Sequence, residues 1–526
     1  FQVGNQYSKT WSFTDINYAI ASKEDKTSMF LDYSELLNAL DSGASAKITI
    51  YNRRINKAEF ERSVLLPDKD DGLDEYRHEF NRMLTAQVTG TSNSIVRERY
   101  LTVSVVKRNA DEAHSYFARI GTDLMTHLAQ LSSVAQELTL TERLHIFRDF
   151  FKAGEQAAAE FNIHEHAKRG QHFKDWFCPD SMEFAADHFK LNARYGRVLY
   201  LQDYASYIKD SFVSELCDLD RDLMLSIDIL PVPTDEAARQ LQSTLLGVET
   251  NVANWQRRQN ANNNFTATIP YDMELQRKET KEMLDDLTTR DQRMMFGLVT
   301  LVHLADSKEQ LDSDTETLYS TARKHLCQLS TLRWQQKDGL DTVLPYGLRK
   351  IQALRTLTTE STAVLIPFRA QEIMEPNGLY YGQNAVSKNM IVADRRLLLN
   401  GNSFRLGVSG SGKSMSAKEE IVQIALSTED DILILDPESE FGYLTEALGG
   451  EVIRISATSD THINALDMDR AYGDERNPIV SKSEFVLSLF EQLIGDGMVT
   501  AKEKSILGRC TEQVYLPYIR NGYKGT

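Results

Sequence analysis

The sequence is poor in cysteine: its 526 residues contain four, which are far apart and form no C-x-x-C pair (Cys178, Cys217, Cys327 and Cys510). A disulfide framework or a zinc site is therefore not expected, and a reducing cytosol fits this pattern. Long hydrophobic runs are also missing. The best one, Met294–Ala305, is too short to cross a membrane and contains His303. We expect no membrane span, so any membrane association must come through partners.

Basic residues are scarce relative to acidic ones, with 59 Lys and Arg against 76 Asp and Glu, which gives a net charge of −17. This balance argues against a broad nucleic-acid-binding face, although not against a local basic pore.

The sequence opens without a signal-peptide pattern and begins with Phe1, so we expect it to be part of a longer chain. A chain of this length is too long for one core, and about two to four domains are expected.

The first two-thirds of the sequence mixes strand and helix patterns. The strand patterns are rich in Val, Ile, Leu, Thr and Tyr: Ala46–Tyr51, Tyr100–Val106, Arg197–Gln202, Leu223–Leu230 and Met295–Leu304. Helical stretches such as Asp111–Leu131 and Thr234–Arg258 lie between them. This alternation predicts a mixed α+β domain, for which a split βαβ type is one candidate.

Two further segments predict long exposed helices. Asp272–Arg293 is dense in opposite charges, which suits a solvated face. Ser313–Lys337 carries an apolar stripe (Leu318, Ala322, Leu326, Leu329 and Leu332) for which core packing is favoured over a subunit contact. His303 lies near the end of an apolar strand and is interpreted as a packed core residue rather than a ligand.

A domain boundary is expected near Thr342–Leu348 or a little later, before Thr359–Phe368. We therefore divide the chain into an α+β domain for docking and oligomerisation (residues 1–345) and an α/β domain (residues 346–526). In the second domain Phe404–Leu406 predicts a short extended strand, and Asp431–Leu435 and Glu451–Ile455 predict buried parallel strands. These strands indicate the start of a RecA-like nucleotide-binding core that is incomplete at its C-terminus.

Residues 407–414 form a G-x-x-x-x-G-K-S loop between an extended apolar stretch and a helical pattern. The nucleotide-binding residues predicted from it are Gly407, Val408, Ser409, Gly410, Ser411, Gly412, Lys413, Ser414 and Met415. Backbone N–H groups of such a Walker A loop, together with the N-terminus of the next helix, bind phosphate oxygens. Lys413 would reach the β- and γ-phosphates of ATP, and the Ser414 hydroxyl would ligate Mg²⁺. In the helix, Ala417, Ile421, Ile424 and Ala425 form one predicted apolar face.

Acidic residues follow the apolar strand pattern that comes after this helix. Asp436 and Glu438 resemble a Walker B element, but the strand comes only 23 residues after Lys413. We place them at the carboxyl end of a neighbouring strand, with Asp436 as a candidate Mg²⁺ ligand and Glu438 as a candidate catalytic carboxylate. Acids that cap a strand and turn the chain are the alternative.

Several motifs in residues 355–470 carry a family resemblance. Lys413, Asp436-Pro437-Glu438 and Ile463-Asn464-Ala465-Leu466-Asp467-Met468 resemble the large energising ATPases of type IV secretion and conjugation machines, the VirB/TraC/TrbE class. Upstream, Arg355–Ser361, Ile366-Pro367-Phe368, Gly378–Gly382 and Asn400-Gly401-Asn402 agree with it. Two departures are Ala465, where the family tends to have Pro, and Arg405 in the strand before the loop. A buried Arg405 would be costly without a partner, so that strand is expected to be partly exposed.

The resemblance implies a cytoplasmic ATPase, usually hexameric, that is peripheral at the inner face of the cell membrane. It implies ATP and Mg²⁺ as cofactors. Its implied partners are inner-membrane subunits of the secretion channel and a coupling ATPase, with DNA as a further candidate. The family's Walker B acids and arginine finger are expected beyond Thr526, so we expect this chain to bind Mg²⁺–nucleotide but to turn it over poorly.

Two alternative functions remain open from the sequence. The first is a DNA-pumping translocase of the related HerA/FtsK group, which DNA-stimulated turnover would favour. The second is a structural subunit whose nucleotide site only sets its conformation.

Overall fold

The computed structural model describes residues 1–54, 64–90, 95–152, 168–170, 172–205, 207–262, 268–290, 292–375, 377–456, 458–470, 472, 477–495 and 497–524. The chain divides into two compact units, Phe1–Ile432 and Leu433–Thr526. Each unit is described by itself below.

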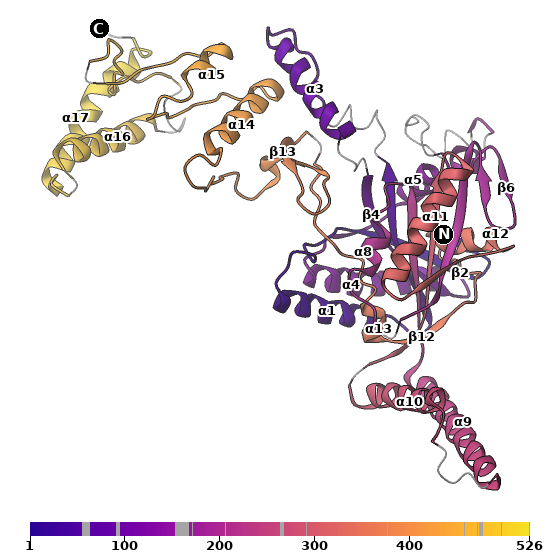
Figure 1. Cartoon of the computed structure of the whole chain (residues 1–526). Coiled ribbons are helices and arrows are strands. Elements are labelled where there is room, and N and C mark those ends of the chain that lie inside the picture. The colour runs from indigo at the N-terminus through magenta and orange to yellow at the C-terminus, as the bar shows by residue number, and fades with distance from the viewer. Residues whose placement is uncertain are drawn as a thin grey trace. The chain divides into compact units, whose positions relative to one another are not determined.

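Most strands of the first unit form one twelve-stranded sheet (Figure 1). They are β1 (Gln2–Val3), β2 (Gln6–Phe13), β3 (Ala44–Arg54), β4 (Ile95–Val106), β5 (Ala135–Glu137), β6 (Met182–Phe184), β7 (Phe189–Leu191), β8 (Arg194–Asp203), β9 (Leu223–Pro231), β10 (Met294–Ala305), β11 (Gln328–Thr331) and β12 (Arg355–Thr358). The order is β1-β2-β4-β3-β9-β10-β8-β7-β6, with β5 on β2, β11 on β8 and β12 on β10. Every pairing in it is antiparallel. All five strands predicted from the first two-thirds of the sequence are confirmed, as β3, β4, β8, β9 and β10.

Helices lie on both faces of this sheet and at its edges. The first unit contains α1 (Lys23–Asn38), α3 (Asp74–Gly90), α4 (Ala110–Gln130), α5 (Leu140–Phe151), α7 (Phe173–Phe177), α8 (Phe212–Leu216), α9 (Thr234–Ala261), α10 (Tyr271–Thr289), α11 (Lys308–Lys324), α12 (Gln336–Val343), α13 (Thr359–Ala363), the 3-10 helix η1 (Arg395–Leu397) and α14 (Lys413–Ser427). One core cluster joins α1, α4, α8 and α11 to one face of the sheet, and a second joins α5, α7 and α12 to the other. The mixed α+β class is therefore confirmed for this unit, and we call the sheet with these helices the sheet body.

The segment Thr342–Leu348 is packed inside the sheet body rather than at a domain boundary. Polar side chains on one face of the sheet donate to its carbonyl oxygens: Ser226 to Val343 (2.5 Å), Ser8 to Tyr346 (2.8 Å), Ser104 to Gly347 (3.0 Å), and Lys47 to Leu348 (3.1 Å) and to Thr342. Beyond this segment β12 still pairs with β10, and Ile366 and Phe368 are buried in the core. The chain thus stays in the sheet body about 20 residues past the expected boundary at 345.

The helix predicted over Ser313–Lys337 is wrong in its second half. The structure ends α11 at Lys324, continues with strand β11 and begins α12 at Gln336. Leu326 has a positive φ of 58° and is 83% exposed, whereas the other four residues of the apolar stripe are buried. Pairing of β11 with β8 satisfies backbone groups at the sheet edge, and this tertiary gain overrides the helical spacing.

The two charged helices form a hairpin that projects from the sheet (Figure 1). α9 and α10 correspond to the predicted Thr234–Arg258 and Asp272–Arg293, and Arg277 of α10 pairs with Glu249 of α9 at 2.8 Å. At the base, Ala237, Leu241 and Leu287 pack with Met294 of β10, and Val248 and Val252 are buried farther along α9. Few buried apolar side chains and many ion pairs agree with the expected solvated surface.

None of the three strand segments predicted for the second domain forms a strand in the structure. Phe404–Leu406, Asp431–Leu435 and Glu451–Ile455 have no strand partner among the described residues. Their apolar side chains face solvent: Phe404, Leu406, Leu433 and Leu435 are each about 90% exposed. A parallel strand is stable only between neighbours that pair with its backbone, and apolar content alone does not provide them.

Candidate nucleotide-binding site

The predicted phosphate loop, residues 407–414, leads into α14, whose first two residues are Lys413 and Ser414. Gly410 and Gly412 have positive φ values of 76° and 88°, and Gly412 is the N-cap residue of α14. Residues with a Cβ rarely adopt this conformation, so these two positions require glycine for the loop to curl. The Ser411 N–H donates to the Val408 carbonyl at 3.2 Å, which closes the turn. The N-terminal end of a 15-residue helix therefore opens onto a glycine-rich turn.

Lys413 folds back over this loop. Its ammonium group donates to the carbonyl oxygens of Gly407 and Val408, both at 3.1 Å. A cation in this position adds to the partial positive charge of the helix N-terminus. Met415 in the same turn is 70% exposed. The loop is open to solvent, so the positive end of α14 is accessible to an anion.

Ser414 has the chemistry expected of a Mg²⁺ ligand. Its side chain is half-buried, and in the part of the chain that the structure describes its hydroxyl has no hydrogen-bond partner. A hydroxyl oxygen next to bound phosphates suits Mg²⁺, which prefers oxygen ligands and usually retains several waters. The residues present thus fit a Mg²⁺–nucleotide, with Lys413 at the phosphates and Ser414 at the metal.

Arg405, which departs from the apolar pattern before the loop, has a partner that the sequence did not indicate. Its guanidinium forms an ion pair with Glu420 on α14 and donates to the Ser416 hydroxyl at 3.3 Å. Glu420 also pairs with Arg395 and accepts a 3.0 Å hydrogen bond from the Tyr381 hydroxyl. The Glu420 side chain is 6% exposed and that of Arg405 is 32% exposed. The expected partial exposure is confirmed, and a charged network links the loop to its own helix.

The buried face of α14 differs from the predicted one. Ala417, Ile421, Ile424 and Ala425 are half-buried, while Glu420, Gln423 and Leu426 are buried. Gln423 binds both backbone groups of Tyr380 (2.7 and 2.8 Å) on β13 (Leu379–Gln383), which pairs with β14 (Met390–Ala393). A polar side chain with two such hydrogen bonds loses little free energy by burial, so the hydrophobicity pattern alone misidentified the packed face of α14.

Sequence reasoning missed Glu420, Arg395 and Gln423. Arg405, a charged residue in an apolar segment, was the one sequence feature that indicated a missing ion-pair partner. It did not indicate that this partner is Glu420.

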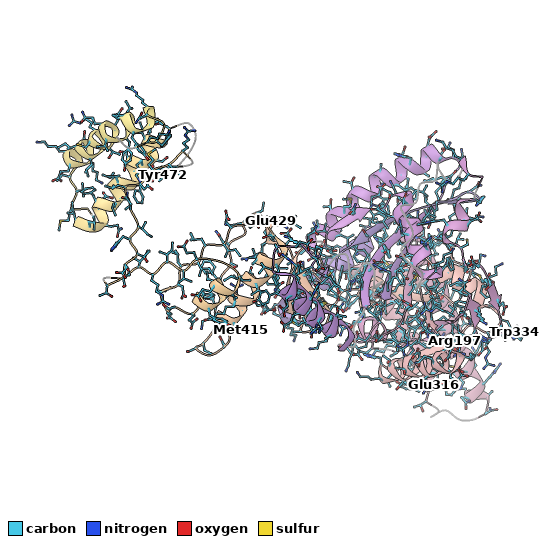
Figure 2. The ribbon with its side chains drawn as sticks, turned by 90° about the horizontal axis from the view of Figure 1, so that it is seen from above. Arg197, Glu316, Trp334, Met415, Glu429 and Tyr472 are labelled. Atoms are coloured by element: carbon cyan, nitrogen blue, oxygen red, sulfur yellow. The ribbon has the colours of Figure 1, made fainter. Side chains whose placement is uncertain are left out.

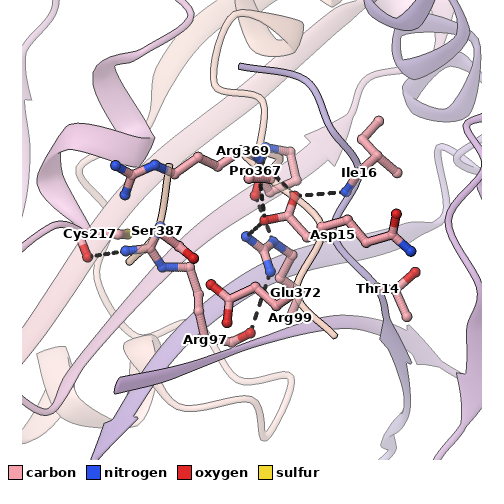
Figure 3. A network of polar contacts seen from close by, with 12 residues as sticks. Thr14, Asp15, Ile16, Arg97, Arg99, Cys217, Pro367, Arg369, Glu372 and Ser387 are labelled. Carbon is pink, nitrogen blue, oxygen red and sulfur yellow. Dashed lines mark hydrogen bonds and ion pairs between the residues drawn. The ribbon is translucent and has the colours of Figure 1, made fainter. Parts of the chain in front are cut away.

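The chain leaves the sheet body through a buried polar network (Figure 3). The Asp15 carboxylate accepts backbone N–H bonds from Ile16 (2.9 Å), Arg369 (2.7 Å) and Ala370 (3.1 Å), and pairs with Arg99. Arg99 in turn donates to the Pro367 carbonyl at 2.8 Å. Because both side chains are nearly fully buried, this network fixes where the segment leading to β13 begins.

The acidic candidates lie in the second unit, which contains α15 (Gly442–Ala447), α16 (Pro478–Ile494) and α17 (Ala501–Arg520). Asp436 accepts the Phe441 N–H at 2.8 Å, and this and further backbone hydrogen bonds lower its pKa. These bonds stabilise a turn of the backbone, which is the alternative to Mg²⁺ binding given above for Asp436. Glu438 is exposed. The phosphate loop is in the other unit, so the pairing of Ser414 with Asp436 and the catalytic role of Glu438 stay predictions.

The motif Ile463–Met468 is held by the two long helices of the second unit. Lys482 of α16, a buried side chain, donates to the carbonyls of Ala465 (3.0 Å) and Asp467 (2.6 Å). The Tyr515 hydroxyl of α17 donates to the Leu466 carbonyl at 2.5 Å. This part of the family resemblance therefore coincides with an ordered loop.

Comparison with models of protein families and with curated proteins finds no match to this chain. Within the described residues, no group of three or more His, Cys, Asp and Glu side chains is arranged to hold a metal ion. None of the helices there combines the length and the apolar character needed to cross a bilayer.

Proposed function

We propose that this chain binds Mg²⁺–ATP at residues 407–415 and is an ATPase. The observation that carries the proposal is the loop geometry: two glycines with positive φ at the start of α14, and Lys413 folded over the loop carbonyls. Backbone N–H groups, the helix N-terminus and the lysine would bind the phosphates, while Ser414 would hold Mg²⁺. The Mg²⁺ ion would neutralise charge that develops on the phosphates.

We further propose that the ATPase energises a type IV secretion or conjugative transfer machine. The family resemblance of residues 355–470 supports this, as do the hydrogen bonds that hold the backbone of its Ile463–Met468 motif. The finer architecture that we propose is a RecA-like core. Exposed apolar side chains in the three unpaired segments support it, because burying them in a sheet would be favourable.

The proposed partners follow from the same resemblance. They are other copies of this chain in a hexamer, inner-membrane subunits of the channel, a coupling ATPase and, as a further candidate, DNA. The proposed location is the inner face of the cell membrane, with the N-terminal α+β region as the docking surface.

The experiment that tests nucleotide binding compares Lys413→Ala with the wild type. We expect Lys413→Ala to lose most of its affinity for a fluorescent Mg²⁺–ATP analogue, because the cation over the loop is removed. Lys418→Ala, a lysine of the same helix, is the matched control and should bind as the wild type does. In cells, Lys413→Ala should abolish conjugative transfer. Wild-type affinity of Lys413→Ala would refute the nucleotide site, and wild-type transfer would refute the energising role.

A further inference from the structure

The C-terminal end of α14 is capped by two cations that lie about 350 residues earlier in the chain. Arg77 donates to the Leu426 carbonyl at 3.0 Å. Lys69 donates to the carbonyls of Ser427 (3.2 Å) and Thr428 (3.3 Å) and pairs with Glu429 at 2.8 Å. The last carbonyls of a helix lack intrahelical partners and carry partial negative charge, so cations are favoured there. Figure 2 labels Met415, in the first turn of α14, and Glu429, which follows the C-cap residue Thr428.

The turn that carries the two cations is held together by its own hydrogen bonds. The Arg77 side chain is fully buried, and its guanidinium also binds Asp71 (2.6 Å) and Asp74 (2.5 Å). The hydrogen bond from Arg77 holds the pKa of Asp71 well below its usual value. Asp74 also accepts the backbone N–H groups of Lys69 and Asp70, both at 3.0 Å. The turn that presents Lys69 and Arg77 is therefore a single hydrogen-bonded unit, and it can contact or release the end of α14 as a whole.

This turn belongs to an insertion between β3 and β4, two neighbouring strands of the sheet body. The insertion includes α3, which leaves the sheet and packs on the β13–β14 hairpin (Figure 1). Leu84 and Phe80 of α3 contact Met390, Val392 and Tyr380. Tyr380 is the residue bound by Gln423 of α14. The insertion thus contacts α14 directly through the cap and indirectly through the hairpin, and in the sequence it is flanked by the sheet strands β3 and β4.

We propose that Lys69 and Arg77 are positioning residues for the phosphate loop, and that nucleotide binding is coupled through α14 to the β3–β4 insertion. The inference rests on the proposed nucleotide site. A 15-residue helix is a stiff rod of about 22 Å, so its capped end and its loop end move together. If the cap favours the orientation in which the loop binds phosphate, then nucleotide must strengthen the cap by the same factor, because coupling is reciprocal. The phosphate loop is then sensitive to whatever moves the insertion.

The test measures affinity and local opening together. Affinity for fluorescent Mg²⁺–ADP is measured for the wild type, Arg77→Ala, Lys69→Gln and Lys69→Arg. The exposed Arg82 on α3 provides the matched control, Arg82→Ala. Hydrogen exchange of residues 66–81 is followed with and without nucleotide in the wild type and in Lys413→Ala. We expect Arg77→Ala and Lys69→Gln to lose about fivefold or more in affinity, within the usual range of coupling between sites. Lys69→Arg should restore much of it, and Arg82→Ala should bind as the wild type does.

In the wild type, nucleotide should slow exchange in residues 66–81, and Lys413→Ala should remove this protection. Circular dichroism establishes that each variant is folded, and Lys69→Gln provides the test if Arg77→Ala does not fold. No binding by the wild type would refute the proposed function itself. Unchanged affinity of both folded variants, in a wild type that binds, would overturn the coupling alone. Weaker binding without nucleotide-dependent protection would overturn it as well, because the cap would then be static.

Discussion

The charged network before the phosphate loop allows a sharp test of how the loop is held. Glu420→Gln keeps the size of the side chain but removes the negative charge between Arg395 and Arg405. The amide oxygen can still accept one hydrogen bond, while the new NH₂ group would face a guanidinium, so two donors would meet. Glu420 is nearly fully buried, and water cannot easily replace the lost charge.

The magnitude follows from the contacts. A hydrogen bond to a charged group contributes about 1.5–3 kcal/mol, and Glu420 makes two such bonds to arginines. Both arginines are about a third exposed and can regain water, so we expect a net loss of about 2 kcal/mol rather than the full sum. If this loss of about 2 kcal/mol destabilises only the loop conformation that binds phosphate, the affinity for nucleotide decreases by roughly thirtyfold, since about 1.4 kcal/mol corresponds to a tenfold change in affinity.

The assay is titration of the fluorescent Mg²⁺–ATP analogue, with Glu419→Gln as the matched control. Glu419 is the neighbouring glutamate on α14, and its side chain is exposed. The double variant Arg405→Gln/Glu420→Gln should lose less than the sum of the two single changes, because the residues interact directly. Binding by Glu420→Gln within twofold of the wild type would refute the view that this network holds the loop.

Two predictions concern the sheet body. Burial lowers the pKa of His303 to about 3, with a further contribution from the positive charge of Arg197. The folded state therefore keeps His303 neutral, and stability that is full above about pH 6.5 should fall by about 1.4 kcal/mol per pH unit as the pH drops toward 3. Urea unfolding between pH 7 and 5 should show a shallower pH dependence for His303→Gln, and an unchanged slope would contradict this. Asp15→Asn leaves Arg99 buried without its counter-charge, so the free energy of unfolding at pH 7 should fall by about 3–5 kcal/mol. The control Glu35→Gln changes an exposed side chain and should leave this free energy nearly unchanged. A loss below about 1 kcal/mol for Asp15→Asn would show that the stability of the fold does not depend on the Asp15 charge.

Part of the candidate site could be predicted because its chemistry is local. Gly410, Gly412 and Lys413 lie within four residues of each other, and the conformation that they require is encoded by the absence of a Cβ and by a helix start. The residues that hold the loop could not be found in this way. Glu420 pairs with Arg395, 25 residues earlier, and the Arg77 that caps α14 is separated from Leu426 by 349 positions. Neither the helical nor the strand periodicity of a sequence can indicate that residues so far apart are in contact.

Local signals in the sequence were sufficient to predict the five long strands, the helices α9 and α10 and the glycine-rich turn. Each rests on side-chain alternation, helical charge spacing or the freedom of glycine, which act over a few neighbouring residues. Tertiary structure alone decided that β11 interrupts a helical pattern, that Thr342–Leu348 is a packed segment, and that Gln423 rather than Ile424 faces the hairpin. In each case a backbone or side-chain hydrogen bond to a distant element outweighs local preference, because a polar group that is buried without a partner costs more than propensity gains.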